Sequence, residues 1–105
     1  MSVSVIGGNV RAIGVLTATI NPASVAAATS AEQTFTIPGL KVGDAVHVNK
    51  PTATAGVGIV NARVSAADTL AITFMNATAG AVDPASETYT IVYLRTDFAM
   101  TAVID

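Results

Sequence analysis

The sequence lacks cysteine altogether and contains a single histidine, His47. Without cysteine, neither a disulfide nor a thiolate-bound metal cluster can stabilise the chain. A metal site at His47 would need further nitrogen or thiolate ligands, and the sequence offers neither. A catalytic triad is equally hard to assemble, because serine and threonine abound but the only imidazole has no evident partner. We therefore expect no metal, no cofactor and no enzymatic activity, and we interpret His47 as a surface or interface residue.

Charge is also scarce. Charged residues make up 11% of the chain, well below the roughly 25% of an ordinary soluble domain. Five Lys and Arg against seven Asp and Glu leave a formal net charge of −2 and no basic run, which argues against a nucleic-acid partner. Hydrophobic residues reach 51%. Two interpretations are open: a small domain coated with alanine and threonine, or a subunit that buries surface against partners. We favour the second, because assemblies bury the apolar surface that a monomer leaves in water.

Long hydrophobic runs are missing as well. No stretch reaches the about 18 consecutive apolar residues of a membrane span, so we expect no membrane partner. The first residues, MSVSVIGGNVRAIG, lack the basic region of a secretory signal, and glycines interrupt their hydrophobic part. We expect synthesis in the cytoplasm without export by the general route.

The sequence does contain short stretches in which apolar and polar residues alternate, which is the pattern of β-strands. Turn signals separate these stretches at regular spacing, as is typical of a sandwich or barrel. We predict one domain over residues 1–105, an all-β antiparallel β-sandwich, jelly-roll-like, with seven or eight short strands. The candidate strands are residues 2–6 (a strand or an extended arm), 10–20, 32–37, 45–49, 57–64, 69–75, 88–95 and 98–104.

The stretch from Ala55 to Arg95 carries the strongest alternation, and we interpret it as two hairpins, the first with a four-residue loop at 65–68. Residues 69–75 place Leu70, Ile72 and Phe74 on one face, which we assign to the core. Residues 88–95 carry apolar side chains on both faces, so this strand is predicted to be central, with something covering each side.

Glycine, carboxylate and tyrosine positions raise further questions. Gly14, within the strand at 10–20, marks a bulge or a close backbone approach. Carboxylates at turns usually cap their own backbone, and the spacing here does not match a calcium loop. A glycosidase pair of Asp83 and Glu87 has little support without a cleft. Two tyrosines on one strand face either stack sugars or, as we favour, pack in the core with their hydroxyls at the rim. The turn carboxylates are Asp44, Asp68, Asp83 and Glu87, and the tyrosines are Tyr89 and Tyr93.

Residues 34–51 and 55–95 read TFTIPGLKVGDAVHVNKP and AGVGIVNARVSAADTLAITFMNATAGAVDPASETYTIVYLR. This text resembles a module of small bacteriophage virion proteins of the head decoration, cement or head-fibre-base type. The matching elements are a threonine-rich strand, a turn and strand at Gly39 to Val48, a hairpin at Ala62 to Thr78 and a closing strand at Pro84 to Tyr89. The resemblance omits both termini. It implies an all-β fold, frequent trimerisation and binding to a capsid lattice, and it brings no catalytic residues.

The expected function is therefore that of a non-enzymatic virion protein that decorates and stabilises the capsid. Its expected partners are further copies of itself, as a homotrimer, and the major capsid protein. It would be made in the host bacterial cytoplasm and lie on the capsid exterior. The alternatives are a receptor- or glycan-binding module of a phage head or tail fibre and, with the least support, a small hydrolase.

The two termini lie outside the resemblance and carry the predicted contacts. Residues 1–9 are interpreted as an N-terminal arm and residues 98–105 as a C-terminal interface strand. We expect at least one of them to pair with a neighbouring subunit or the capsid; otherwise both complete the protomer's own sheets. The expected contact residues are Val3, Val5, Phe98, Met100 and Ile104.

Overall fold

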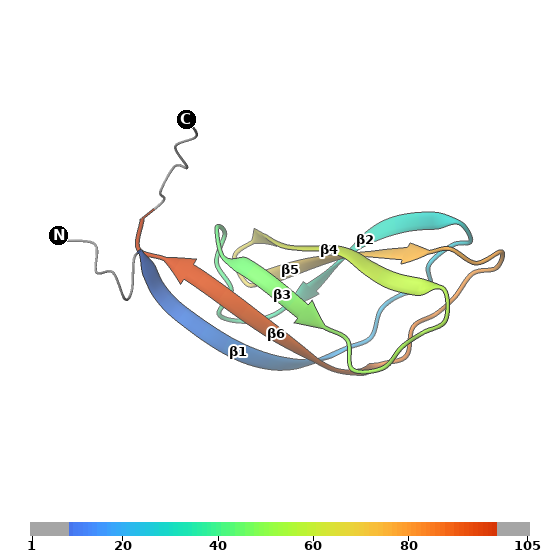
Figure 1. Ribbon diagram of the computed structural model, residues 1–105, viewed down its shortest axis with the longest axis horizontal. Helices are drawn as coiled ribbons and strands as arrows, with labels where there is room; N and C mark the ends of the chain where they lie inside the picture. Colours follow the sequence, from blue (N-terminus) through green and yellow to red (C-terminus); the bar gives the residue numbers. More distant parts are fainter. Residues whose placement is uncertain (1–8, 99–105) are drawn as a thin grey trace, which may run out of the picture.

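The computed structural model describes residues 9–98, which form six strands and no helix (Figure 1). Two antiparallel three-stranded sheets result, with the strand orders β1-β6-β3 and β2-β5-β4. Among these strands only β4 and β5 form a hairpin, and every other connection passes from one sheet to the other. The strands are β1 (Val10–Ile20), β2 (Thr29–Thr36), β3 (Ala45–Asn49), β4 (Val57–Ala66), β5 (Thr69–Asn76) and β6 (Glu87–Thr96).

All six internal strands predicted from the alternation are present, with bounds that differ by up to three residues. The candidates at 2–6 and 98–104 fall outside the described residues, apart from Phe98. The jelly-roll arrangement and the total of seven or eight strands therefore stay predictions.

The interpretation of residues 55–95 as two hairpins is wrong. β4 and β5 form the first hairpin, but β6 pairs with β1 and β3 in the other sheet. The first hairpin is also tighter than predicted: Ala66 pairs with Thr69, so only Ala67 and Asp68 connect the strands. Asp68 adopts a φ of 58°, a left-handed conformation that aspartate tolerates in turns.

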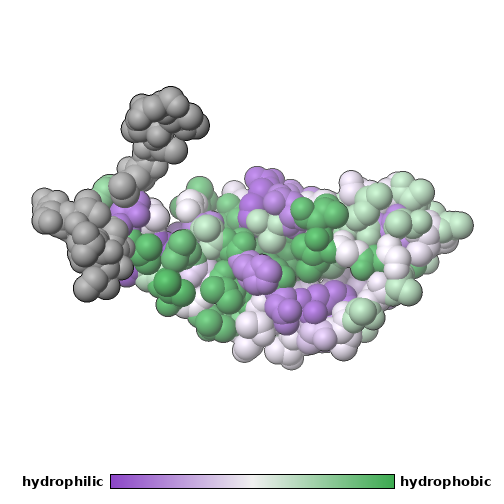
Figure 2. Space-filling view, viewed as in Figure 1, coloured by the Kyte–Doolittle hydropathy of each residue, from purple (hydrophilic) through white to green (hydrophobic). Residues whose placement is uncertain are grey.

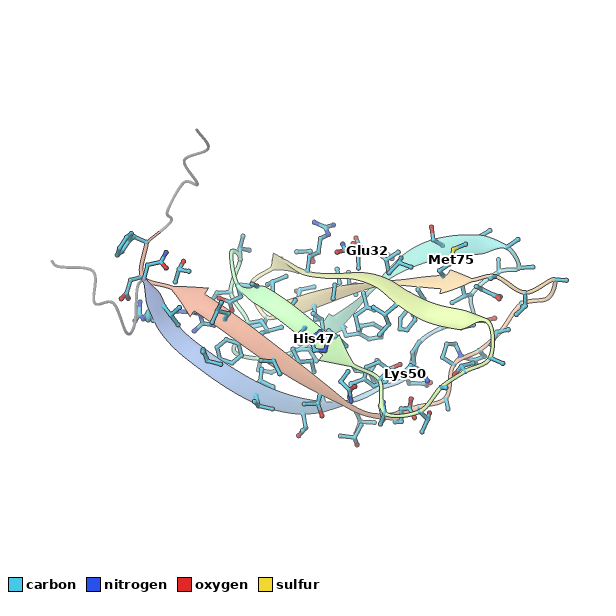
Figure 3. The ribbon with its side chains drawn as sticks, viewed as in Figure 1. Glu32, His47, Lys50 and Met75 are labelled. Atoms are coloured by element: carbon cyan, nitrogen blue, oxygen red, sulfur yellow. The ribbon has the colours of Figure 1, made fainter. Side chains whose placement is uncertain are left out.

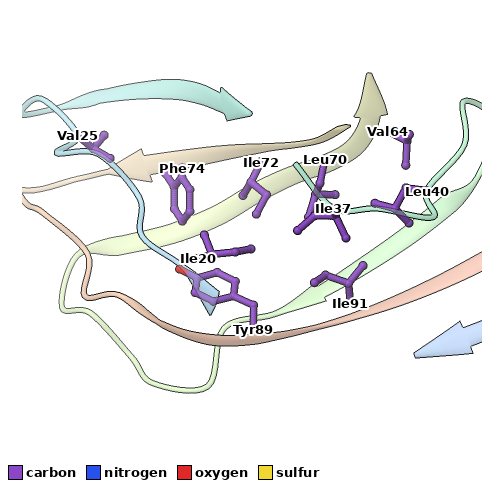
Figure 4. Packing of buried hydrophobic residues seen from close by; sticks show 10 residues of the cluster. All are labelled: Ile20, Val25, Ile37, Leu40, Val64, Leu70, Ile72, Phe74, Tyr89 and Ile91. Atoms are coloured by element: carbon purple, nitrogen blue, oxygen red, sulfur yellow. The ribbon is translucent and has the colours of Figure 1, made fainter. Parts of the chain in front are cut away.

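The central strand of each sheet supplies the middle of the core. Leu70, Ile72 and Phe74 of β5 are fully buried, as the alternation predicted. They face Tyr89 and Ile91 of β6 from the other sheet, and Figure 4 shows the two sets projecting toward one another. A large aliphatic side chain buried in this way stabilises the fold by about 1.5–3 kcal/mol. The two sheets thus share one core in a sandwich-like arrangement, which Ile20, Val25, Ile37, Leu40 and Val64 complete.

One end of the core is closed by a loop that binds both sheets. The amide of Gly39 donates to Asp68 Oδ1 (2.8 Å), while the Gly39 carbonyl accepts from Arg95 Nη2 (2.8 Å). Gly39 has a φ of 101°, which favours glycine because a Cβ would be strained there. The next residue, Leu40, is buried beneath this loop. Asp68 was predicted to cap its own turn, but it instead caps a loop 29 positions away.

The other end is closed by Asn76, the only buried polar residue among those described. Its amide nitrogen donates to the carbonyls of Val25 (3.0 Å) and Gly80 (2.9 Å). Its Oδ1 accepts from the amide (2.9 Å) and the hydroxyl (2.7 Å) of Thr78. All four hydrogen-bonding positions of the side chain are satisfied, so its burial is compatible with a stable core.

Gly14 is a site of close contact, although with a side chain and not with the backbone that the sequence interpretation considered. Gly14 pairs with Tyr93 across β1 and β6, and a methyl group at Gly14 would collide with the Tyr93 ring. The ladder is irregular elsewhere in β1, between Val10 and Ala12. The guanidinium of Arg95 lies 5.0 Å from the centre of the same ring and makes two hydrogen bonds to Asp44. This stack holds the start of β1 and the end of β6 in a fixed geometry.

Candidate interaction surface

The outer face of the β1-β6-β3 sheet carries an unusual number of apolar side chains. Two cross-strand rows lie side by side there: Ile13–Leu94–Ala45 and Val15–Val92–His47. Ile13 and Val15 are 67% and 65% exposed, although both lie within a regular strand. Val92 and Leu94 are half-buried by their neighbours. We call Ile13, Val15, Val92, Leu94 and Ala45 the apolar band.

The band occupies only one half of this face. Toward the other end of the strands, the outward positions of β1 and β6 become threonines, which pair as Thr17–Thr90 and Thr19–Thr88. Figure 2 shows hydrophobic residues gathered over the half of the sheet where β1 begins and β6 ends. The same sheet therefore has one half suited to water and one half that is not.

The outer face of the β2-β5-β4 sheet is different. Arg63 of β4 and Glu32 of β2 form a bidentate ion pair, with both hydrogen bonds at 2.9 Å. In the register of the sheet this pair spans the central strand, and Ala71 between them is fully buried. The hydrogen bonds from Arg63, with a smaller contribution from its charge, lower the pKa of Glu32. Glu32 and Met75, labelled in Figure 3, both lie on this face.

His47 lies on the exposed side of β3, next to Val92, as its strand phase predicted (Figure 3). It borders the apolar band rather than a cavity. Residues 9–98 contain no pocket, and no group of three His, Cys, Asp or Glu side chains there is placed to hold a metal ion. This part of the chain also lacks any helix long and apolar enough to cross a membrane.

Asp83 and Glu87, which had little support as a glycosidase pair, do not line a cleft within residues 9–98. Asp83 is exposed in its loop. One oxygen of Glu87 accepts from Thr52 Oγ1 (2.6 Å), and the other lies 2.9 Å from Lys50 Nζ. The hydrogen bond from Thr52, followed by the neighbouring ammonium of Lys50, lowers the pKa of Glu87. These contacts connect β6 to the loop after β3.

Neither tyrosine side chain is exposed on the surface: Tyr89 is buried, and Tyr93 is partly buried against the core. Tyr89 is fully buried, so the prediction that its hydroxyl lies at the rim is wrong. That hydroxyl has no hydrogen-bond partner among the described residues. Burial, with a smaller contribution from the negative charge of Glu87, raises the pKa of Tyr89 to about 12. Tyr93 lies between Gly14 and Arg95, as described above.

Four of the predicted terminal contact residues, Val3, Val5, Met100 and Ile104, lie outside the described residues. Phe98 is described and half-exposed. Its carbonyl accepts from Asn9 Nδ2 (2.7 Å), and the Asn9 carbonyl accepts from the amide of Asp97 (2.8 Å). These bonds hold Asn9 and Phe98 together at the end of the sheet that carries the apolar band.

The sequence interpretation missed Ile13 and Val15. It assigned no role to the outward phase of this strand, in which both residues lie; the residues of the other phase face inward. The signal was present, because β1 carries aliphatic residues in both phases. For β6 the same signal was noticed, and the predicted cover on its second face is not supplied by residues 9–98.

Comparisons with known proteins give no further guide. No protein-family model matches the sequence, and no curated protein and no solved structure is similar enough to count as a match. The apolar band is therefore the feature on which a functional argument rests.

Proposed function

We propose that this chain is a non-enzymatic structural protein of a bacteriophage virion, which decorates the head and stabilises the capsid by binding the lattice of the major capsid protein. The observation that carries the binding role is the apolar band, a hydrophobic area on the sheet that residues 9–98 leave exposed. Monomeric proteins rarely leave such areas in water unless a partner covers them. The resemblance of residues 34–95 to phage decoration and cement modules supplies the class of partner.

The mechanism is bridging. Each copy buries apolar area against its neighbours and the capsid, which raises the free energy needed to separate capsomers. A standard interface buries about 800 Å² per partner. Contacts of this size, repeated over a shell, add stability through avidity rather than through one tight contact. The resemblance further implies a homotrimer and a jelly-roll-like sandwich whose terminal segments add strands or arms.

The alternative, a glycan-binding module of a head or tail fibre, has less support. Sugar-binding sites use exposed aromatic faces, and among the described aromatic residues Tyr89 and Phe74 are buried in the core. Tyr93 is engaged with Gly14 and Arg95. Of the aromatic side chains within residues 9–98, only that of Phe98 is substantially exposed.

The test is the protein composition of purified virions, followed by binding of the recombinant chain to heads that lack it. We expect the chain in virions at many copies, and heads that resist heat better once it is added. Ile13→Thr/Val15→Thr should bind more weakly, whereas the equally exposed Val42→Thr, outside both sheets, should bind normally. Absence from virions together with no binding to heads would refute the proposal, and capture by a glycan array instead would favour the alternative.

A further inference from the structure

The four edge strands of the two sheets are not equally protected. A free edge presents unpaired N–H and C=O groups that can recruit another strand, and proteins normally block it with charge, bulges, short length or a covering loop. β4 carries two irregularities in its ladder. β3 is five residues long and is followed by Lys50 and Pro51. Both therefore carry recognised protection.

β2 is covered as well. Its Gln33 side chain exchanges two hydrogen bonds with the backbone of Ala23, one to the carbonyl (3.0 Å) and one from the amide (2.8 Å). These bonds hold the preceding loop against the strand. Glu32 adds a charge on the outer face.

From Ala12 onward, β1 has none of this protection in the described structure. It is 11 residues long, and it pairs only with β6. From Ala12 to Ile20 it contains no charged residue and no proline. Its one irregularity lies at the start, between Val10 and Ala12. Ile13 and Val15, the most exposed members of the apolar band, lie on this same strand.

We propose that a second copy of this chain covers this edge, with β1 pairing antiparallel to β1 of its partner about a two-fold axis at Gly14. In this register Ile13 of each copy lies opposite Val15 of the other. The two three-stranded sheets join into one six-stranded sheet, and the two apolar bands become continuous on its outer face.

The register follows from self-complementarity. Directly opposite residues in an antiparallel pair share a face, so outward residues of one copy must meet outward residues of the other. Centring the pair on Gly14 gives each exposed aliphatic residue an aliphatic partner. Centring it on Ile13 would place Val15 opposite Arg11, and centring it on Val15 would place Ile13 opposite Thr17. A strand without charge in its middle also presents no like-charge repulsion to its own copy.

The pairing constrains stoichiometry and does not depend on the proposed function. A two-fold contact is isologous, whereas a three-fold ring joins two different surfaces, so β1 cannot pair with β1 inside a simple trimer. The trimer implied by the resemblance and the β1 pair coexist only in an assembly that has both axes. The expected mass is therefore two or six times 10.5 kDa.

The absence of cysteine permits a direct test of the register by oxidative cross-linking. Opposite residues of an antiparallel pair have Cα atoms about 4.5–5.5 Å apart, within the range that a disulfide spans. A mixture of Ile13→Cys and Val15→Cys proteins should therefore form covalent heterodimers faster than either protein alone. Thr17→Cys is the control: it lies on the same exposed face, but in this register it would be about 13 Å along the strand from the partner's residue 15.

Sedimentation of charge variants provides the second measurement. Ile13→Lys should weaken the association about tenfold or more, because it buries an unpaired charge at the seam. Val42→Lys, at 69% exposure against 67% for Ile13, should leave it unchanged, and both should keep the parent's melting temperature as monomers. A monomer or a plain trimer by mass would overturn the proposal. So would a mixture of Thr17→Cys and Val15→Cys proteins that cross-links as fast as the mixture of Ile13→Cys and Val15→Cys proteins. Virion composition plays no part in this outcome, so the two proposals fail separately.

Discussion

The two sheets of this protein have similar inner faces and different outer faces. Each has three strands with a central strand that contributes fully buried side chains to one core. On the outside, the β2-β5-β4 sheet places the Arg63–Glu32 ion pair across its central strand, over the buried Ala71. The β1-β6-β3 sheet places Val92 and Leu94 at the corresponding positions, flanked by the exposed Ile13 and Val15.

The difference separates the residues that stabilise one copy from those that are available for association with another molecule. A sheet of this kind needs one apolar face for the shared core, and its other face is free to be polar. The β2-β5-β4 sheet follows that rule. The β1-β6-β3 sheet departs from it over half its length, and this half adjoins the edge of β1 that residues 9–98 leave unpaired. Within residues 9–98, the core lies on the opposite face of the sheet from those four aliphatic residues.

The largest effect should come from the inner faces, where the sheets are alike. Phe74→Ala in one sheet and Ile91→Ala in the other should each cost about 2–5 kcal/mol, because each leaves a cavity in the core. Ile13→Ala, a similar truncation on the outer face, should cost little in the monomer. Denaturant unfolding of the three variants at low concentration checks this. Equal losses at all three positions would mean that the outer face is covered even in a single copy.

Exchanging the character of the outer faces should change association rather than stability. Ile13→Thr/Val15→Thr should weaken self-association by roughly tenfold to a hundredfold, since it removes apolar area from the contact. Glu32→Val/Arg63→Val makes the second face apolar and should create a new, concentration-dependent association. Analytical ultracentrifugation distinguishes the two variants. If the double valine variant remained as dispersed as the parent, an apolar sheet face alone would not be enough for association.

Lowering the pH should remove the stabilisation that the Asp44–Arg95 and Glu32–Arg63 ion pairs contribute, and the two contributions should differ in size. Hydrogen bonds from Arg95 lower the pKa of Asp44, and those from Arg63 lower the pKa of Glu32. The folded state therefore holds these protons less tightly, so the stabilisation is present at neutral pH and is lost as pH falls below about 4.

Asp44→Asn should lower the melting temperature at pH 7 more than Glu32→Gln does. Asp44 is nearly buried and also accepts from the amide of Lys41, whereas the other pair is open to solvent. Melting temperatures between pH 2 and 7 should show each variant's deficit shrinking toward acid. A deficit that stayed constant with pH would assign the effect to packing instead of charge.

A smaller effect is expected at Tyr89, whose buried hydroxyl has no partner among the described residues. Tyr89→Phe should leave stability at pH 7 unchanged or raise it by up to about 1 kcal/mol, because it removes an unsatisfied polar group. Since the folded-state pKa is raised to about 12, the unfolded chain loses this proton first. The parent should therefore lose stability as pH rises from about 10 toward 12, and the phenylalanine variant should lose less. Identical alkaline melting curves would contradict the assignment.

The smallest effect should be at His47. His47→Ala removes an exposed side chain at the margin of the apolar band and should change the free energy of unfolding by less than about 0.5 kcal/mol. Chemical denaturation provides the measurement, with Val48→Ala on the inward phase of the same strand as the damaging counterpart. A large loss at His47 would show that it has a structural role that the register does not reveal.

Local pattern was enough to place the six internal strands and to orient most of their side chains. Leu70, Ile72 and Phe74 could be assigned to the core because the side-chain period of a strand is two. Gly14 could be recognised as a close approach because glycine weakens a strand unless something needs its space. The candidate surface was only half visible: β6 showed apolar residues in both phases, while in β1 the second phase was overlooked.

The sequence by itself determined the strands, their inward faces and the scarcity of charge. Side-chain alternation and turn residues are local properties, so they can be recognised from neighbouring positions in the sequence. The tertiary structure alone decided which strands became neighbours. It sent β6 to the sheet opposite the β4–β5 hairpin, joined Gly39 to both Asp68 and Arg95, and buried the Tyr89 hydroxyl. It also placed Ile13 beside Leu94 and Val15 beside Val92, turning two separate outward phases into one band. Pairings between residues some 80 positions apart leave no periodic signal, since they depend on how the whole chain closes over its core.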